Sequence, residues 1–200
     1  MNTQNSTVTK LAETALMAAL CYVSFTFLQI KIPVPGGDAT SIHIGNAFCV
    51  LAALLIGGVY GGLSGAIGMG IADLMDPVYI TGAPKTFVLK FCIGLITGLV
   101  AHKYAKINES TDKAYVFKWS LIASIAGLAF NVVADPIVGY FYKMYILGQP
   151  QKMAEVLAKW STAATFVNAV ISTVLVACLY NALRPILLRS GMILTKRAGK

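Results

Sequence analysis

The 200-residue sequence is poor in charge: 12% of its residues are charged, with 8 acidic residues against 16 lysines and arginines. Ordinary soluble domains carry about 25% charged residues. The few charges are also unevenly placed, because residues 44–72 and 161–183 contain none. Stretches of this length without charge cannot form a soluble surface, which excludes an ordinary soluble domain.

Sequence patterns of common catalytic and metal centres are also missing. There is no GxxxxGK[ST] segment, so the chain cannot bind ATP through a P-loop. His43 and His102 stand outside any HExxH pattern, and the four cysteines form no CxxC pair and lie in apolar segments. We therefore predict that the chain is not an enzyme, binds no metal and needs no cofactor.

Long apolar runs are what the sequence does contain, with 57% hydrophobic residues in total. A helix crosses a bilayer with about 20 apolar residues. We predict an all-α integral membrane protein of one domain, residues 1–200, with both termini cytoplasmic. Its six transmembrane helices are expected at about 11–30, 44–58, 60–76, 84–103, 116–142 and 156–188, with residues 31–43 as a loop.

The lysines and arginines set the orientation of this prediction. With the N-terminus inside, 10 of the 16 fall on the cytoplasmic side. Five of the eight acids then fall outside: Asp38, Asp73, Asp76, Asp135 and Glu155. Because cytoplasmic segments carry the excess of lysine and arginine, this topology indicates a multi-pass protein of the cell membrane with a polar outer end.

Polar and small residues recur three or four apart on the last three predicted helices, so each helix presents one polar stripe. Such stripes are costly against lipid and therefore indicate a polar hollow in the outer half of the membrane. Three alternatives remain open: Lys90 snorkels outward, Asn131 and Asn168 bond each other, and Asp135 before Pro136 only ends a helix. The stripes are Thr86, Lys90, Gly94 and Thr97; Ser124, Gly127, Asn131 and Asp135; and Ser161, Thr165, Asn168 and Ser172.

Small residues also gather on one face of the first and third predicted helices. Small side chains let helix backbones approach closely in a membrane. Two interpretations stay open, namely packing within this chain and docking of a separate membrane subunit. The residues concerned are Ala12, Ala15 and Ala19 on the first helix, and Gly61, Gly65 and Gly68 on the third.

Four stretches, in this order, carry a resemblance to a known family: "AETALMAAL", "IPVPGGDATSIHIGNAF", "LAALLIGGVYGGLSGAIGMGIADL" and "TGAPKTFVLKFCIGLITGL". The chain resembles the S component of an energy-coupling-factor (ECF) vitamin transporter over residues 11–185. The resemblance implies a high-affinity binding subunit for a vitamin-like molecule in the membrane. Its partners would be a transmembrane scaffold subunit and two ATPase subunits, without nucleic acid.

The resemblance also assigns roles to positions in this sequence. The loop 31–43 would cover the pocket, and the small-residue faces named above would dock on the scaffold. Asn46 departs from the family pattern, because "HIGN" replaces "HLGD" here. The predicted substrate-binding residues are Asp38, His43, Asn46, Tyr79, Lys85, Phe87, Lys90, Asn131, Asp135, Tyr140 and Asn168.

The substrate follows less directly from the residues. Aromatic faces at Tyr79, Phe87 and Tyr140, beside donors and acceptors, suit a flat polar heterocycle. We favour pyridoxine or hydroxymethylpyrimidine, with riboflavin and cobalamin as open alternatives. The alternative function is a self-sufficient secondary transporter or channel, against which the scarcity of mid-membrane acids and the lack of repeats argue.

Overall fold

A computed structural model describes residues 3–34 and 38–189 of the chain. Six α-helices form a bundle, and short 3-10 and π turns lie at Ile80–Gly82, Leu99–Tyr104 and Tyr142–Ile146. Residues 35–37 of the predicted loop lie outside the described residues. The main elements are α1 (Thr3–Phe27), β1 (Gln29–Val34), β2 (Asp38–His43), α2 (Gly45–Ile56), α3 (Gly58–Met75), α4 (Ala83–Gly98), α5 (Lys113–Phe141) and α6 (Gln151–Arg189).

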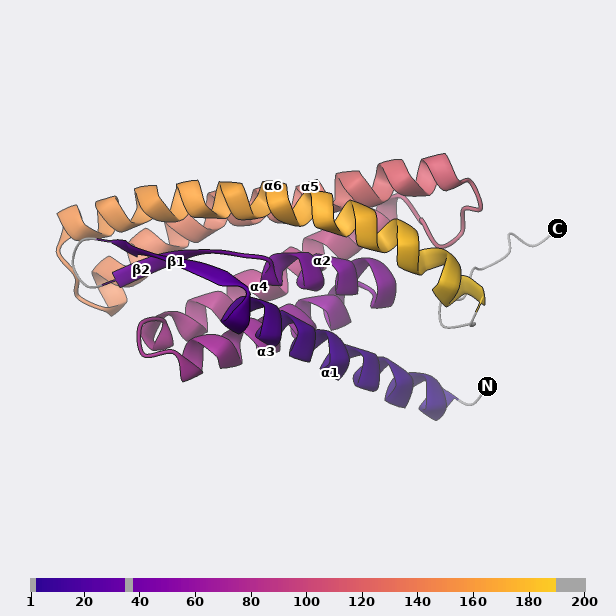
Figure 1. The fold of residues 1–200 in the computed structure, drawn as a ribbon, viewed down its shortest axis with the longest axis horizontal. Helices are drawn as coiled ribbons and strands as arrows, with labels where there is room; N and C mark the ends of the chain where they lie inside the picture. Colours follow the sequence, from indigo (N-terminus) through magenta and orange to yellow (C-terminus); the bar gives the residue numbers. More distant parts are fainter. Residues whose placement is uncertain (1–2, 35–37, 190–200) are drawn as a thin grey trace.

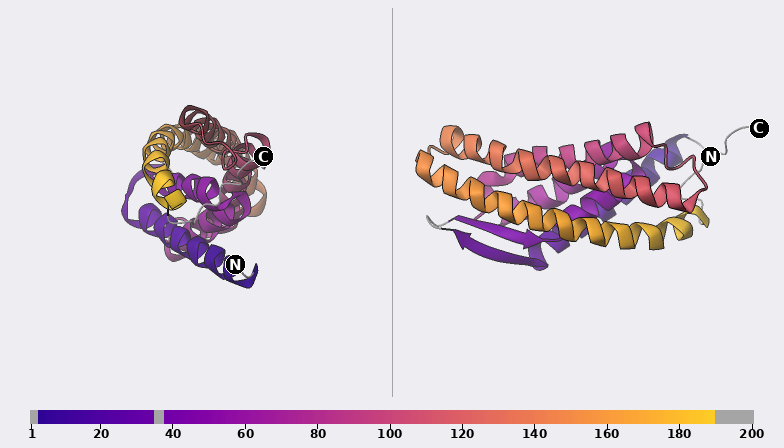
Figure 2. Two further views of the ribbon diagram at one scale, coloured as in Figure 1. Left: turned by 90° about the vertical axis from the view of Figure 1, so that its right-hand side faces the viewer. Right: turned by 90° about the horizontal axis from the view of Figure 1, so that it is seen from above.

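The helices lie around α2, which is short and central. Helices α5 and α6 run side by side along the length of the molecule, and α1 and α3 lie on the opposite side (Figures 1 and 2). Nine of the 12 residues of α2 are buried, because α2 packs against α1, α3, α4 and α6. Helix α2 is therefore the core of the bundle, and the surrounding helices separate most of its surface from lipid.

Among residues 3–34 and 38–189, four helical segments are long and apolar enough to cross a membrane: Thr7–Phe27, Ile80–Tyr104, Lys113–Ile146 and Gln151–Arg189. Helix α2, at 12 residues, is about 18 Å long, whereas the hydrocarbon core of a bilayer is about 30 Å thick. The prediction of six helices is confirmed, and that of six complete spans stays a prediction. The start of α1 and the end of α6 lie at the same end of the bundle (Figure 1), and their cytoplasmic location also stays a prediction.

Large apolar side chains cover the outside of the bundle. Phe27, Val88, Val133, Phe166 and Ile186 are all at least 59% exposed, and they come from four different helices. A soluble monomer rarely exposes apolar residues around its whole circumference. This surface is what a helical bundle in lipid requires.

The predicted loop 31–43 is a β-hairpin, so the purely helical description needs this correction. Strands β1 and β2 pair antiparallel from Gln29 opposite His43 to Val34 opposite Asp38. Val34 of β1 and Ser41 and His43 of β2 are buried, while the other residues of the two strands are less so. The two prolines and two glycines of this segment are typical of a loop and hid the strands in the sequence pattern.

The glycines of α3 pack inside the chain. A Cβ atom on Gly61 would lie 2.3 Å from the backbone of Ala53 in α2, and one on Gly68 would lie 2.2 Å from the carbonyl oxygen of Ala18 in α1. A Cβ on Gly65 would lie 2.3 Å from Sγ of Cys49. The assignment of these three glycines to partner docking is therefore corrected, because α1 and α2 already cover them.

Most helices begin and end close to the predicted positions, but α1 begins at Thr3, eight residues before its predicted start at 11. Gly57 alone, at φ 97°, separates α2 from α3, because only glycine adopts this conformation readily. Helix α6 begins at Gln151, five residues before its predicted start at 156. Helix α5 continues through Pro136 to Phe141, so Asp135 is not a helix terminus.

Candidate functional site

A cavity of about 140 Å³ lies at the end of the bundle that carries the hairpin, which we call the hairpin end. Its walls come from both strands and from α1, α3, α4, α5 and α6. Polar and charged residues on these walls include Asp38, Ser41, His43, Asp73, Tyr79, Lys85, Thr86, Lys90, Asp135, Lys143, Ser161, Thr165 and Asn168. Part of each predicted polar stripe thus reaches this cavity, namely Thr86 and Lys90 of α4, Asp135 of α5, and Ser161, Thr165 and Asn168 of α6.

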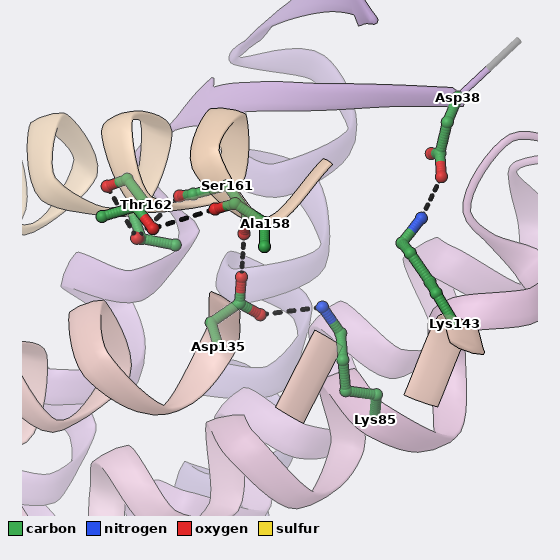
Figure 3. Close-up of polar contacts among 8 residues, drawn as sticks. Asp38, Lys85, Asp135, Lys143, Ala158, Ser161 and Thr162 are labelled. Carbon is green, nitrogen blue, oxygen red and sulfur yellow. Dashed lines mark hydrogen bonds and ion pairs between the residues drawn. The ribbon is translucent and has the colours of Figure 1, made fainter. Parts of the chain in front are cut away.

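Asp135 joins three helices across the cavity wall. Lys85 Nζ of α4 donates to Asp135 Oδ1 at 2.9 Å, and the Ser161 hydroxyl of α6 donates to Asp135 Oδ2 (Figure 3). The Lys85 and Asp135 side chains are only 16% and 13% exposed. Because both charges have lost most of their water, this pair fixes the spacing of α4, α5 and α6 around the cavity.

Two ion pairs hold the hairpin over the cavity. Asp38 of β2 pairs with Lys143, which follows α5 (Figure 3), and Lys31 of β1 pairs with Asp76, which follows α3. Burial disfavours the charged Asp76 carboxylate, but hydrogen bonds from Lys31 and from the backbone N–H of Val78 outweigh it and lower its pKa. Both pairs therefore tie strands of the predicted lid to loops at the hairpin end.

Asn168 fixes the base of the hairpin. Its Oδ1 accepts a hydrogen bond from the His43 backbone N–H, and its Nδ2 donates to the Ser41 carbonyl, both at 2.9 Å. Asn168 is buried, and it pairs with strand backbone instead of with Asn131. The alternative that Asn131 and Asn168 bond each other is therefore excluded.

His43 ends β2 and faces the cavity as a neutral ring. Its Nδ1 accepts from the Gly45 backbone N–H at 3.2 Å, which assigns the ring proton to Nε2. Burial, and then the nearby Lys90, lowers the pKa of His43 to about 3, against a smaller opposite effect of Asp135. Phe25 packs edge-on against the ring at 4.6 Å. His43 is thus a hydrogen-bond donor on the cavity wall at neutral pH.

Lys90 and Asp73 lie deeper in the cavity. Lys90 is 7% exposed and Asp73 is 4% exposed. The Thr86 hydroxyl is hydrogen-bonded to the Asp73 carboxylate. Neither Lys90 nor Asp73 forms an ion pair with any residue in the described part of the chain. Lys90 is buried, so its side chain does not snorkel to the surface as one alternative proposed.

Seven of the eleven predicted binding residues line the cavity, whereas Asn46, Phe87, Asn131 and Tyr140 do not. Phe87 is 43% exposed and lies beside Gly70 of α3, facing outward. Tyr140 is half-buried and packs edge-on against Phe141. Both aromatic positions are corrected, because each lies beside a cavity residue on its helix and is rotated by about 100° from it.

Asn46 and Asn131 are buried below the cavity. Each is 1% exposed, and the Oδ1 atom of each has no hydrogen-bond partner among residues 3–34 and 38–189. Asn131 lies one helical turn below Asp135, so the stripe on α5 continues past the cavity. The lining positions Asp38, His43, Tyr79, Lys85, Lys90, Asp135 and Asn168 keep their assignment as predicted binding residues.

Asp73 and Lys143 are cavity residues that sequence reasoning missed. Asp73 stands at the end of a glycine-rich apolar run. The predicted topology places it on the outer side of the membrane but does not indicate which residues surround it. Lys143 entered the prediction only as one of the lysines and arginines that set the orientation in the membrane. A usable signal existed for Asp73, because an acid within an apolar membrane segment is by default a functional candidate. Lys143 gave no such signal, because it follows the helix in sequence.

The exposed small residues lie on α1. Ala12, Ala15 and Ala19 are exposed, whereas Thr14, Ala18 and Cys21 on the other face of α1 are buried. This half of the docking prediction thus retains an accessible surface. Within the described chain, no group of three or more His, Cys, Asp or Glu side chains could hold a metal ion.

Comparison with known proteins adds a family to this geometry. The family described as "ECF-type riboflavin transporter, S component" matches residues 5–185. A solved structure titled "Structure and mechanism of the S component of a bacterial ECF transporter" superposes with a TM-score of 0.61. The superposition covers 90% of this chain and 98% of that chain at 17% sequence identity, so it supports the fold alone.

A curated relative carries less information. An uncharacterized protein of Pyrococcus woesei, described by its place in a gap 3' region, is 32% identical over 76 residues. These residues cover 38% of this chain and 49% of the relative. The chain thus spans about half the length of this curated relative.

Proposed function

The chain belongs to the S-component family of ECF-type riboflavin transporters, and we propose that its cavity binds a single-ring, vitamin-like heterocycle for import. S components are the substrate-binding subunits of these transporters. The observation that carries the proposal is the polar cavity under the hairpin, with seven predicted binding residues on its walls. The hairpin end faces the outside in this proposal, as the distribution of lysine and arginine predicts.

The cavity volume favours one ring. An apolar cavity of about 150 Å³ accommodates a benzene molecule, and the cavity here measures about 140 Å³. Pyridoxine and hydroxymethylpyrimidine each contain one six-membered ring. We therefore favour these two compounds as substrates.

Riboflavin is the second candidate, because the family description names it. Its three fused rings need more space than a cavity of about 140 Å³ provides. Binding of riboflavin would require the hairpin to move away from α5 and α6. That movement would break the pair between Asp38 and Lys143 and the hydrogen bonds of Asn168.

Direct binding tests the proposal. The purified chain is titrated with pyridoxine, hydroxymethylpyrimidine, riboflavin and cobalamin by calorimetry, and native mass spectrometry identifies any vitamin that co-purifies. We expect tight binding of one single-ring compound. The control Asn181→Ala, an exposed asparagine of α6 outside the cavity, should leave that affinity unchanged. Absence of binding to all four compounds contradicts the proposed function.

The partners are proposed from the family and from α1. A transmembrane scaffold subunit would dock on Ala12, Ala15 and Ala19, and two ATPase subunits would supply energy. The exposed position of these alanines supports this docking. The absence of an ATP-binding loop from the sequence is consistent with separate ATPase subunits.

A bulky substitution separates docking from binding. Ala15→Trp should leave substrate affinity unchanged and abolish uptake and co-purification of the scaffold in native membranes. Ala163→Trp, at an exposed position of α6, is the matched control and should retain uptake. Loss of substrate affinity in Ala15→Trp would show that this face belongs to internal packing. Uptake by the chain alone in liposomes would instead support the secondary-transporter alternative.

A further inference from the structure

The charges around the cavity are unequally paired. Six charged side chains of the described residues line it, and four of them form two ion pairs: Lys85 with Asp135, and Lys143 with Asp38. The remaining two are Lys90 of α4 and Asp73 of α3. Within the described residues no ion pair includes either of them. The deeper part of the cavity thus presents one cation and one anion that lack ionic partners.

Burial makes these two groups unusual. Lys90 lies seven residues after the start of α4, about 10 Å along its axis. It is 7% exposed, and Asp73 is 4% exposed. A charge removed from water is strongly disfavoured unless another charge or several hydrogen bonds replace the water. Asp73 has the Thr86 hydroxyl as a partner, which leaves most of its hydrogen-bonding capacity unused.

The surroundings of Lys90 favour an anion as its missing partner. Lys90 lies within electrostatic range of Asp135, Asp73 and Lys85, but Asp135 already binds Lys85 and Ser161. His43 also lines the cavity within electrostatic range of Lys90. Since its Nδ1 accepts from Gly45, its Nε2–H remains as a second donor. Two donors, one of them charged, thus face the same space.

We propose that the substrate of this cavity carries an anionic oxygen that binds Lys90 and a protonated nitrogen that binds Asp73. The inference rests on the proposed function and narrows it to a zwitterionic heterocycle. The compound class is a single ring with an acidic hydroxyl or carboxyl group and a basic ring nitrogen or amine. Charge-assisted hydrogen bonds at both groups would replace the water that burial removes.

The test compares ligands on the unaltered protein. Pyridoxine has an acidic ring hydroxyl and a basic ring nitrogen. Its 3-O-methyl ether lacks the acidic proton, and its carbocyclic analogue has CH in place of the ring nitrogen. Losing one charge-assisted hydrogen bond should weaken binding about 10- to 100-fold. We therefore expect each analogue to bind 10- to 100-fold more weakly than pyridoxine.

Variants assign each loss to a residue. Lys90→Met should bind pyridoxine and its methyl ether with the same reduced affinity, and Asp73→Asn should lose the preference for the ring nitrogen. Lys152→Met, an exposed lysine outside the cavity, should keep both preferences. A purely structural Lys90 would weaken both ligands equally and preserve their ratio, which overturns the inference.

The outcomes separate this inference from the proposed function. Tight binding of a single-ring compound without an acidic group, such as hydroxymethylpyrimidine, with no preference for acidic compounds, overturns the inferred zwitterionic substrate and leaves the proposed binding function standing. A protein that binds no compound of the series overturns both. Preserved discrimination in Lys90→Met also overturns the inference, provided that thermal unfolding shows a folded variant.

Discussion

The C-terminal half of α4 packs on α3 backbone to backbone, whereas the N-terminal half extends long charged side chains into the cavity. In the C-terminal half, a Cβ atom on Gly94 would lie 2.2 Å from the backbone nitrogen of Gly62, and one on Gly98 would lie 2.2 Å from Cα of Gly58. In the N-terminal half, Lys85, Thr86 and Lys90 line the cavity. The same helix therefore combines a contact without free space and a wall with space for a ligand.

The contrast explains why the cavity keeps its shape. A contact between two backbones leaves neither helix room to shift, because no side chain can change rotamer to absorb a movement. Helix α4 is therefore fixed relative to α3. Its lysines then extend from a fixed backbone, and the remaining freedom lies in their side chains. Rigid packing of the C-terminal half of α4 thus positions adaptable polar groups in its N-terminal half.

Filling the backbone contact should have the largest effect. Gly94→Leu places a side chain where Gly62 backbone lies at 2.2 Å from the new Cβ, and the backbone cannot move aside as a side chain would. We expect the variant to yield no monodisperse folded protein, measured by size-exclusion chromatography in detergent. Gly82→Ala is the control, since no atom lies within 4 Å of its Cβ position. A folded Gly94→Leu protein would contradict the tight contact.

Removing the central charge of the cavity should have the next largest effect. Asp135→Asn leaves Lys85 buried without its ionic partner, and breaking such a pair costs about 3 kcal/mol of folding free energy. The midpoint of thermal unfolding should fall, and ligand affinity with it. The double variant Lys85→Met/Asp135→Leu should recover stability without recovering affinity. Equal stability of the single and double variants would show that the pair does not hold the helices.

The sequence predicted the helices well, because membrane burial leaves a strong signal in composition. The run that forms α5 was expected at 116–142 and is found at Lys113–Phe141. The spacing of polar residues also correctly predicted that Lys90, Asp135 and Asn168 line a shared polar cavity. A stripe on one helix depends only on the helical period, so it can be derived without knowing the neighbours.

The partners of a residue could not be derived in the same way. Gly61, Gly65 and Gly68 form one face in sequence, but α1 and α2 cover that face. Phe87 and Tyr140 have the right chemistry and point away from the cavity. The hairpin was hidden because two prolines and two glycines give its segment of the sequence the composition of a loop. Each of these outcomes depends on long-range packing, which one sequence does not encode locally.

Releasing the hairpin from α6 should weaken substrate binding and leave the contact between α3 and α4 unchanged. Asn168→Ala removes both hydrogen bonds to the strand backbone at His43 and Ser41, which leaves a buried donor and acceptor unpaired. The cost should be about 2 kcal/mol of substrate binding free energy, measured by calorimetry. Thermal unfolding should change less than for Asp135→Asn, because the helix contacts remain. An unchanged affinity would show that the hairpin is fixed independently of Asn168.

Acidification should have the smallest effect, because it acts through His43 on the cavity wall and leaves the contact between α3 and α4 in place. The pKa of His43 is lowered from 6.5 to about 3 by burial and by Lys90, against the opposing charge of Asp135. Below pH 6.5 the His43 side chain therefore binds a proton in the unfolded chain but stays neutral in the folded chain. The free energy of unfolding consequently falls as the pH drops from 6.5 toward 3. Between pH 7.5 and pH 6 the loss should be about 0.8 kcal/mol. Thermal unfolding of the His43→Gln variant should lack this part of the pH dependence. If the variant and the unaltered protein show the same pH dependence, His43 is not buried as a neutral ring.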